Sequence, residues 1–205
     1  IKMVSDISCN VTKVDHTRNL LYVCNETEKL PGCKGGGGQI FVFKIDPETG
    51  DLTKLSSTPT LGSNPCQFSF TPDCKYMVVA HHARPSGFTK VVKSCDGKYT
   101  SSVEFETASL NLFRMNENGT IGDLVDVVWF DDSGTPESKG HSMLHMAEIS
   151  PSGNVIAVSD IGLDRIYTFE IDRVHEKLVQ KFVYNDIPGS TPRYCRFHPF
   201  KPILY

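Results

Sequence analysis

HMAEISPSGNVIAVS, at His145 to Ser159, has the pattern of a β-hairpin: alternating apolar residues, a Pro-containing turn, and a second short run rich in Val and Ile. The same template occurs three more times, each time with a Pro or an Asp in the turn. The other copies are VTKVDHTRNLLYVC at Val11 to Cys24, CQFSFTPDCKYMVVA at Cys66 to Ala80, and RYCRFHPFKPILY at Arg193 to Tyr205. A hairpin that repeats along a chain of 205 residues predicts a repeat architecture made of β-sheets.

Each of the first three hairpins is followed by a third run with strand alternation and then by a weaker fourth run. The third runs are QIFVFKI, SLNLFRM and RIYTFEI, and the fourth runs are DLTKLSS, TIGDLVDVV and KLVQKFV. Four strands connected up and down form one blade of a β-propeller. The turn anchors lie 56, 79 and 48 residues apart, at His16, Pro72, Pro151 and Pro199. The shortest interval is close to one blade, whereas a β-sandwich, the alternative, does not repeat a single template.

We therefore predict an all-β chain that forms one partial β-propeller domain over residues 1–205, with about three and a half four-stranded blades. Propellers avoid exposed strand edges by closing a ring, and this many blades cannot close one. We accordingly expect the natural protein to be longer. An insertion in the second blade, at about residues 81–107, is expected to be a solvated loop, with a role at the channel mouth or in a subunit contact as alternatives.

Composition excludes several classes of function. The hydrophobic fraction of 39% suits a globular protein, and no apolar run approaches the roughly 18 residues that a membrane span needs. The net charge of −3 and the scattered Lys and Arg residues argue against nucleic-acid binding. Seven cysteines without CxxC pairs favour reduced thiols in the cytoplasm, although Asn-x-Thr sequons at Asn10, Asn25 and Asn118 are typical of secreted proteins. His81, His82 and His141 are not spaced as metal ligands, so we expect no metal site.

The register of the repeats indicates candidate site residues. Counting six residues back from each turn anchor gives Asn10, Cys66, His145 and Arg193. Because the innermost strands of a propeller line its channel, these residues should meet at one mouth of it. Histidine can take a proton from water, and arginine offers a planar fork to phosphate, carboxylate or a developing oxyanion. Tyr194 could line the same pocket, although strand alternation would turn it away from Arg193. The alternative interpretation is that these are ordinary polar residues at strand ends on a solvent-exposed surface, without a functional role.

Four stretches also resemble the seven-bladed propeller lactonases, a family that includes bacterial-type 6-phosphogluconolactonases and fungal carboxymuconate cyclases. The stretches are GQIFVFKIDPETGDLTKL, NPCQFSFTPDCKYMVVA, HMAEISPSGNVIAVSDIGLDRIYTFEID and GSTPRYCRFHPFKPILY. They cover nearly the whole chain apart from the insertion, and DIGLDRIYTFEID is the most specific part. The resemblance implies about half of a ring of seven blades.

The resemblance also implies which residues form the site. His145 matches the histidine of the family's His-x5-Pro pattern, and Arg193 matches the arginine of its Gly-Pro-Arg-His stretch. This chain departs from the pattern at Tyr194, where the family has His, and at Thr191, where it has Gly. The family also places a Glu shortly after the strand that begins at Pro202, and that position lies beyond the end of this sequence.

The activity implied is hydrolysis of 6-phospho-D-glucono-1,5-lactone to 6-phosphogluconate, in the pentose phosphate pathway. His145 would then be the general base, Arg193 would bind the phosphate or the oxyanion, and Asn10, Cys66 and Tyr194 would line the pocket. The partner would be a small anionic lactone, and the reaction would need no metal or organic cofactor. A cyclase acting on a carboxylated muconate and a non-catalytic protein-binding platform are the alternatives.

Overall fold

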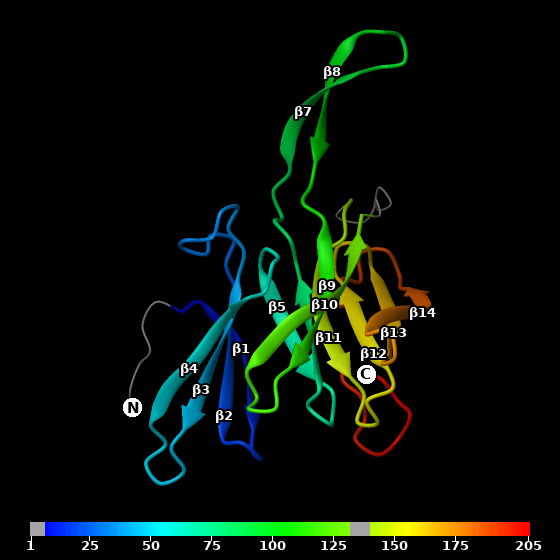
Figure 1. The fold of residues 1–205 in the computed structure, drawn as a ribbon. Coiled ribbons are helices and arrows are strands. Elements are labelled where there is room, and N and C mark those ends of the chain that lie inside the picture. Colours follow the sequence, from blue (N-terminus) through cyan, green and yellow to red (C-terminus); the bar gives the residue numbers. More distant parts are fainter. Residues whose placement is uncertain (1–6, 132–139) are drawn as a thin grey trace.

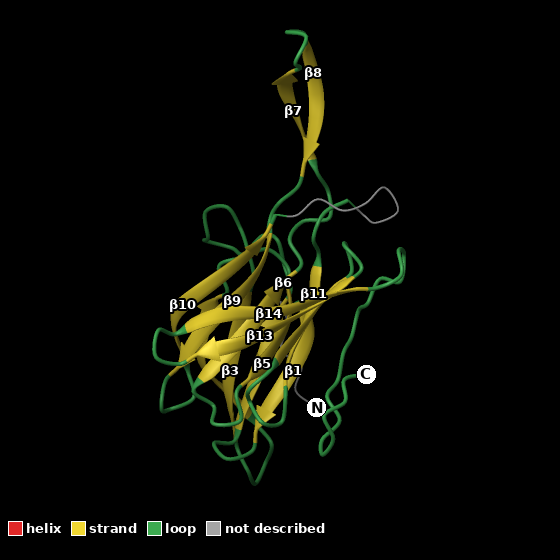
Figure 2. Ribbon diagram, turned by 90° about the vertical axis from the view of Figure 1, so that its right-hand side faces the viewer, coloured by secondary structure: helices red, strands yellow, loops and turns green. Residues whose placement is uncertain are grey.

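The computed structural model describes residues 7–131 and 140–205, and within these ranges every regular element is a β-strand (Figure 2). Twelve strands there form three four-stranded antiparallel sheets, which are the predicted blades. The first blade contains β1 (Cys9–Asp15), β2 (Leu20–Asn25), β3 (Gln39–Ile45) and β4 (Leu52–Pro59). The second contains β5 (Pro65–Phe70), β6 (Tyr76–His81), β9 (Ala108–Met115) and β10 (Ile121–Phe130). The third contains β11 (Leu144–Ile149), β12 (Ile156–Asp160), β13 (Arg165–Asp172) and β14 (Lys177–Asn185).

The blades lie side by side as an arc, which confirms the predicted fold class (Figure 1). The first strand of each blade is the innermost, and β5 contacts β1 on one side and β11 on the other. A fourth, short hairpin follows at the C-terminus, where Arg196 and Tyr205 exchange two backbone hydrogen bonds of 2.9 Å. The repeat that is easiest to see in the sequence thus places the starts of β1, β5 and β11, and the segment that carries Arg193, around one axis.

The second blade is buried on both faces. Tyr76, Val78 and Ala80 in β6 pack against the third blade, whereas Met77 and Val79 pack against the first. This explains why β6 reads YMVVA, an apolar run without polar alternation, because neither face of the strand meets water. Each buried Val or Met side chain of β6 stabilises the fold by about 1.5 to 3 kcal/mol relative to an exposed one.

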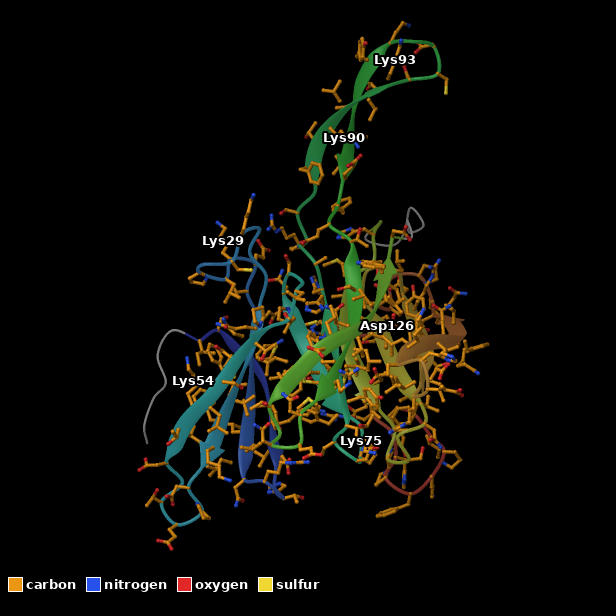
Figure 3. All side chains as sticks on the ribbon, viewed as in Figure 1. Lys29, Lys54, Lys75, Lys90, Lys93 and Asp126 are labelled. Atoms are coloured by element: carbon orange, nitrogen blue, oxygen red, sulfur yellow. The ribbon has the colours of Figure 1, made fainter. Side chains whose placement is uncertain are left out.

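The insertion is a β-hairpin rather than the solvated loop expected from the sequence. β7 (Phe88–Lys93) and β8 (Tyr99–Glu104) form a two-stranded sheet of their own that projects beyond the blades (Figure 1). Lys90 and Lys93 mark this arm in Figure 3. An Asp-Gly turn, with Gly97 at φ 83°, joins the two strands. Asp-Gly between two alternating runs is a hairpin signal. The expectation of a loop was wrong because this turn lets the two runs pair with each other.

No helix that could cross a lipid bilayer occurs in residues 7–131 or 140–205.

Candidate active site

The four positions found by register counting form a continuous series of contacts across the blades. Asn10 Nδ2 donates to the carbonyl oxygen of Cys66 over 2.8 Å. The Cys66 thiol donates to the carbonyl oxygen of Leu144, 3.2 Å away, and Leu144 precedes His145. Arg193 Nε in turn donates to His145 Nε2 over 2.9 Å. The structure therefore brings His145 and Arg193 together at one mouth of the channel.

An irregularity in each inner strand occurs at the candidate position. The pairing of β1 with β2 shifts between Cys9 and Thr12, which includes Asn10. The pairing of β5 with β6 shifts between Pro65 and Gln67, around Cys66, and that of β11 with β12 shifts between Leu144 and Met146, around His145. Such bulges turn a side chain out of the regular alternation and are common next to active sites. They allow the strand starts to direct side chains differently from the rest of each strand.

The hydrogen bond between Arg193 and His145 defines the protonation state and the tautomer of the imidazole. Because a guanidinium only donates, His145 Nε2 must be the acceptor, and the ring is neutral with its proton on Nδ1. His145 is 7% exposed, whereas Arg193 is exposed to solvent. The pair thus joins a shielded base to a cation that a ligand can reach.

Tyr194 contacts both members of the pair. Its ring lies edge-on to that of His145, with centroids 5.1 Å apart, and Arg193 Cζ is 5.6 Å from the Tyr194 ring centre. The expectation that alternation turns Tyr194 away from Arg193 was wrong. Residues 190–196 contain no paired strand, so strand alternation does not apply to them.

Cys66 and Asn10 occupy the predicted place but differ in exposure. The Cys66 thiol is buried, at 3% exposure, and burial raises the pKa of this thiol above its ordinary value. Asn10 is exposed, and its amide is held against the Cys66 backbone. Cys66 therefore contacts Asn10 through its backbone carbonyl, and Asn10 is the exposed member of the two.

Two buried aspartates of the DIGLDR stretch fix the segments that lead to His145 and Arg193. Asp160 Oδ1 accepts from the Met143 amide over 2.8 Å, and Asp160 Oδ2 accepts from Ser142 Oγ over 2.6 Å. Both partners lie just before β11. DIGLDRIYTFEID was the most specific part of the family resemblance. The resemblance did not indicate which atoms the two aspartates would bind.

Asp164 does the same for the segment before Arg193. Its carboxylate accepts from the Gly189 amide over 2.8 Å and from the Thr191 amide over 2.7 Å. Thr191 has φ 47°, a left-handed conformation that disfavours β-branched residues. The resemblance had placed a Gly at this position, and the bond to Asp164 holds Thr191 in a backbone conformation suited to Gly.

Glu26 was not predicted from the sequence, and His82 was predicted only not to be a metal ligand. Each is the residue that follows the second strand of its blade, and antiparallel pairing puts that position beside the start of the first strand. The His82 and His145 rings lie edge-on with centroids 6.3 Å apart. Burial raises the pKa of the Glu26 carboxyl, and the positive charge of Arg193 partly opposes this rise. Applying the register count to the second strands would have found both residues.

A second layer of polar residues lies three positions further along each of the four repeats. We call it the Glu148 network; its members are Lys13, Ser69, Glu148 and Arg196. Arg196 Nη1 lies 2.6 Å from Glu148 Oε1, and Lys13 Nζ lies 3.8 Å from Glu148 Oε2. Ser69 Oγ accepts from Lys13 over 2.9 Å and donates to Glu148 over 3.3 Å. The network links four successive repeats below the mouth.

No group of three His, Cys, Asp or Glu side chains in the described part of the chain is placed to hold a metal ion.

Comparisons with known proteins add an independent finding. A family model described as "Lactonase, 7-bladed beta-propeller" matches residues 10–205. The 6-phosphogluconolactonase of Bacillus subtilis (strain 168) is 23% identical over 171 residues, which is 83% of this chain and 42% of that protein. The 6-phosphogluconolactonase of Formosa agariphila is 25% identical over 165 residues, which is 78% of this chain and 40% of that protein.

Among solved structures, the periplasmic gluconolactonase of Pseudomonas aeruginosa has a similar fold, with a TM-score of 0.67 at 20% identity. The match covers 91% of this chain and 47% of that one. The chain thus spans less than half the length of these relatives. Since the family model covers all three blades and the C-terminal hairpin, the chain belongs to the seven-bladed β-propeller lactonase family.

Proposed function

We propose that the natural protein containing this chain hydrolyses 6-phospho-D-glucono-1,5-lactone to 6-phosphogluconate, as part of the pentose phosphate pathway. The observation that carries the proposal is the His145–Arg193 pair at the channel mouth of a lactonase-family propeller. The names of the B. subtilis and F. agariphila relatives support this choice of substrate.

In the proposed mechanism, the phosphate or the lactone carbonyl draws the Arg193 guanidinium away from His145 Nε2. The lone pair on Nε2 is then free to accept a proton from water as the water oxygen bonds to the carbonyl carbon. Arg193 can stabilise the negative carbonyl oxygen of the tetrahedral intermediate. The bond from this carbon to the ring oxygen then breaks, and the imidazolium returns the proton to that oxygen. The products are a hydroxyl group and a carboxylic acid, and His145 is neutral again.

We also propose that the natural protein is cytoplasmic. All seven cysteines are free thiols, and two of them, Cys9 and Cys95, are exposed. Free exposed thiols are typical of a reducing compartment. Because the P. aeruginosa neighbour is described as periplasmic, cell fractionation of the natural protein is the direct test.

Kinetics of variants in the natural full-length protein test the chemistry. His145→Ala should lower turnover of the lactone by about 10²-fold or more, because general-base catalysis typically contributes 10² to 10⁴. Arg193→Ala should chiefly raise KM if the guanidinium holds the phosphate throughout, and should lower kcat if it meets the oxyanion. Urea unfolding of each variant separates a lost catalytic group from a lost fold.

The exposed His175, changed to Ala, is the matched control and should keep wild-type rates. All rates must be read above spontaneous hydrolysis of the lactone. A wild-type protein that never exceeds this background contradicts the proposed function.

A further inference from the structure

The hydrogen bond between Arg193 and His145 occupies the atom that the proposed chemistry needs. Arg193 Nε donates to His145 Nε2 over 2.9 Å, so the lone pair that would accept a proton from water is already engaged. A general base must reach the proton that it removes, directly or through one water molecule. In this arrangement the arginine therefore caps the base.

The cap is an exposed side chain on an anchored backbone. The carbonyl oxygen of Arg193 accepts from the hydroxyl group of the buried Ser159 over 3.0 Å. Two residues further on, the Cys195 amide donates to Met146 Sδ over 3.3 Å. The Arg193 side chain itself is exposed. Removing the cap from His145 therefore requires a rotation of one side chain and no movement of the segment that carries it.

The guanidinium has donors and charge available for an anion. Among the described residues, none accepts from Nη1 or Nη2 of Arg193 and none forms an ion pair with it. Arginine binds phosphate and carboxylate through two parallel N–H groups, and Nε–H with one Nη–H forms such a pair. An anion attracts the guanidinium more strongly than a neutral imidazole does, because both partners are then charged. An anion therefore competes with His145 for the Nε–H group.

Tyr194 keeps the guanidinium at the mouth when this bond is broken. Arg193 Cζ lies 5.6 Å from the centre of the Tyr194 ring, within the range of a cation–π interaction. The same ring lies edge-on to His145, with centroids 5.1 Å apart. A guanidinium that leaves His145 Nε2 thus still has a partner beside the base, and an anion bound to it stays close to the uncapped imidazole.

We propose that Arg193 is an anion-operated cap on His145: an anionic group of the substrate draws the guanidinium away from Nε2 and thereby makes the base available. The site then selects lactones that carry an anionic substituent, and a separate anion can activate it toward a neutral lactone. This inference rests on the proposed lactonase function and deepens it, because it gives the phosphate of the substrate a role in activating the base.

The first test supplies the lactone and the anion as separate molecules to the natural full-length protein. The substrate is glucono-1,5-lactone, which lacks the phosphate, and the probe is inorganic phosphate at constant ionic strength. Phosphate should raise enzymatic turnover of this lactone by about 10-fold or more, since a hydrogen bond to a charged group has effects of that size. It should instead inhibit hydrolysis of the 6-phosphorylated lactone, by competing for Arg193. Hydrolysis without protein is subtracted at each phosphate concentration, because phosphate itself catalyses the reaction in solution.

Arg193→Met provides the second test, because it removes the cap and keeps a side chain of similar length. Without added phosphate, this variant should hydrolyse the neutral lactone about 10-fold faster than the wild type and should no longer respond to phosphate. Its KM for the phosphorylated lactone should rise. A purely structural role of Arg193 would instead lower activity toward both substrates.

Arg173→Met is the matched control. It removes an exposed arginine that pairs with Asp73 beyond the far end of β13, and it should keep the wild-type response to phosphate. Unfolding midpoints identify any variant that fails to fold, and the measurement on the wild type does not depend on a variant.

The outcomes separate the two proposals. A wild type that hydrolyses the phosphorylated lactone, but whose turnover of the neutral lactone phosphate does not raise, overturns the cap alone. A wild type without activity above spontaneous hydrolysis of the phosphorylated lactone overturns the proposed function, and the cap with it.

Discussion

At the scale of single residues, three histidines show what register counting can and cannot predict. The count found His145 because β1, β5 and β11 each begin one residue before the counted position, so equivalent residues stay in register. Applied to the first strands alone, it gave no information on His81 and His82, which are adjacent in sequence but differ in environment. The His81 ring is 1% exposed and packs against Gly62, whereas the His82 ring approaches His145. Side-chain direction at these strand ends depends on bulges, which the alternation pattern does not reveal.

Burial lowers the pKa of His81 to about 4 from an ordinary value of 6.5. Between these values the unfolded chain binds more protons than the folded one, so stability rises with pH across this window and is lost as pH falls through it. We expect acidification from pH 6.5 to 4 to remove about 3 kcal/mol of unfolding free energy through this residue.

Urea unfolding at several pH values measures the effect. His81→Asn keeps a polar group near Ser109, whose Oγ lies 3.3 Å from His81 Nδ1, and should flatten the pH dependence in this window. The exposed His16, changed to Asn, is the control and should keep the wild-type slope. Parallel slopes for wild type and His81→Asn would contradict the assignment.

At the scale of elements, the blade strands could be predicted because each run of alternating residues has a partner of the same kind. The two segments that departed from expectation do not join a blade sheet. Residues 88–104 pair only within their own hairpin, and residues 190–196 carry Arg193 and Tyr194 without forming a strand. In the second case the conformation comes from side-chain bonds to Asp164, and a single sequence gives no signal for bonds between residues so far apart.

Asp164 is therefore a positioning residue for Arg193. Asp164→Asn replaces one acceptor oxygen by an NH2 group that faces a backbone N–H, which should cost about 1 to 3 kcal/mol of stability. If Arg193 holds the substrate phosphate, the variant should also raise KM by about 10-fold with a much smaller change in kcat.

A purely structural role would lower the amount of active protein and leave KM unchanged, so KM is the discriminating quantity. Asp172→Asn changes a partly exposed aspartate that bonds to the Val174 and His175 amides at the other end of β13, and it should leave KM unchanged. An unchanged KM in Asp164→Asn would show that Arg193 does not depend on this bond.

At the scale of the whole molecule, the repeat predicted the number and order of blades but not how they are held together. Apolar contacts on both faces of the second blade join it to its neighbours, and the Glu148 network adds polar links among the inner strands. The members of this network lie three residues beyond Asn10, Cys66, His145 and Arg193. The same count could have predicted that these four residues share one layer. It could not have predicted which of them pair, because pairing depends on how far each side chain extends.

Glu148 is central to this arrangement, since its side chain is 13% exposed and bonds to three other repeats. Burial lowers the pKa of Lys13, and the charge of Glu148 counteracts this. Glu148→Gln leaves Lys13 partly buried without its counter-charge and should reduce the unfolding free energy by about 1 to 3 kcal/mol.

The urea midpoint of unfolding checks this value. Glu170→Gln, which removes an exposed partner of Lys181, is the control and should change the midpoint little. Equal midpoints in both variants would mean that apolar packing alone joins the blades.

The arm formed by β7 and β8 leaves the second blade and re-enters it at neighbouring points, because β6 and β9 pair directly from Tyr76↔Arg114 to His81↔Ser109. The continuity of that blade therefore depends on its hydrogen-bond ladder and not on the peptide chain that passes through the arm. A protease that cuts the exposed turn at Ser94 to Lys98 would produce two polypeptides that remain one folded particle. A break in the covalent chain at the tip of the arm therefore need not break the folded domain. The tip is a suitable position for a new pair of chain termini.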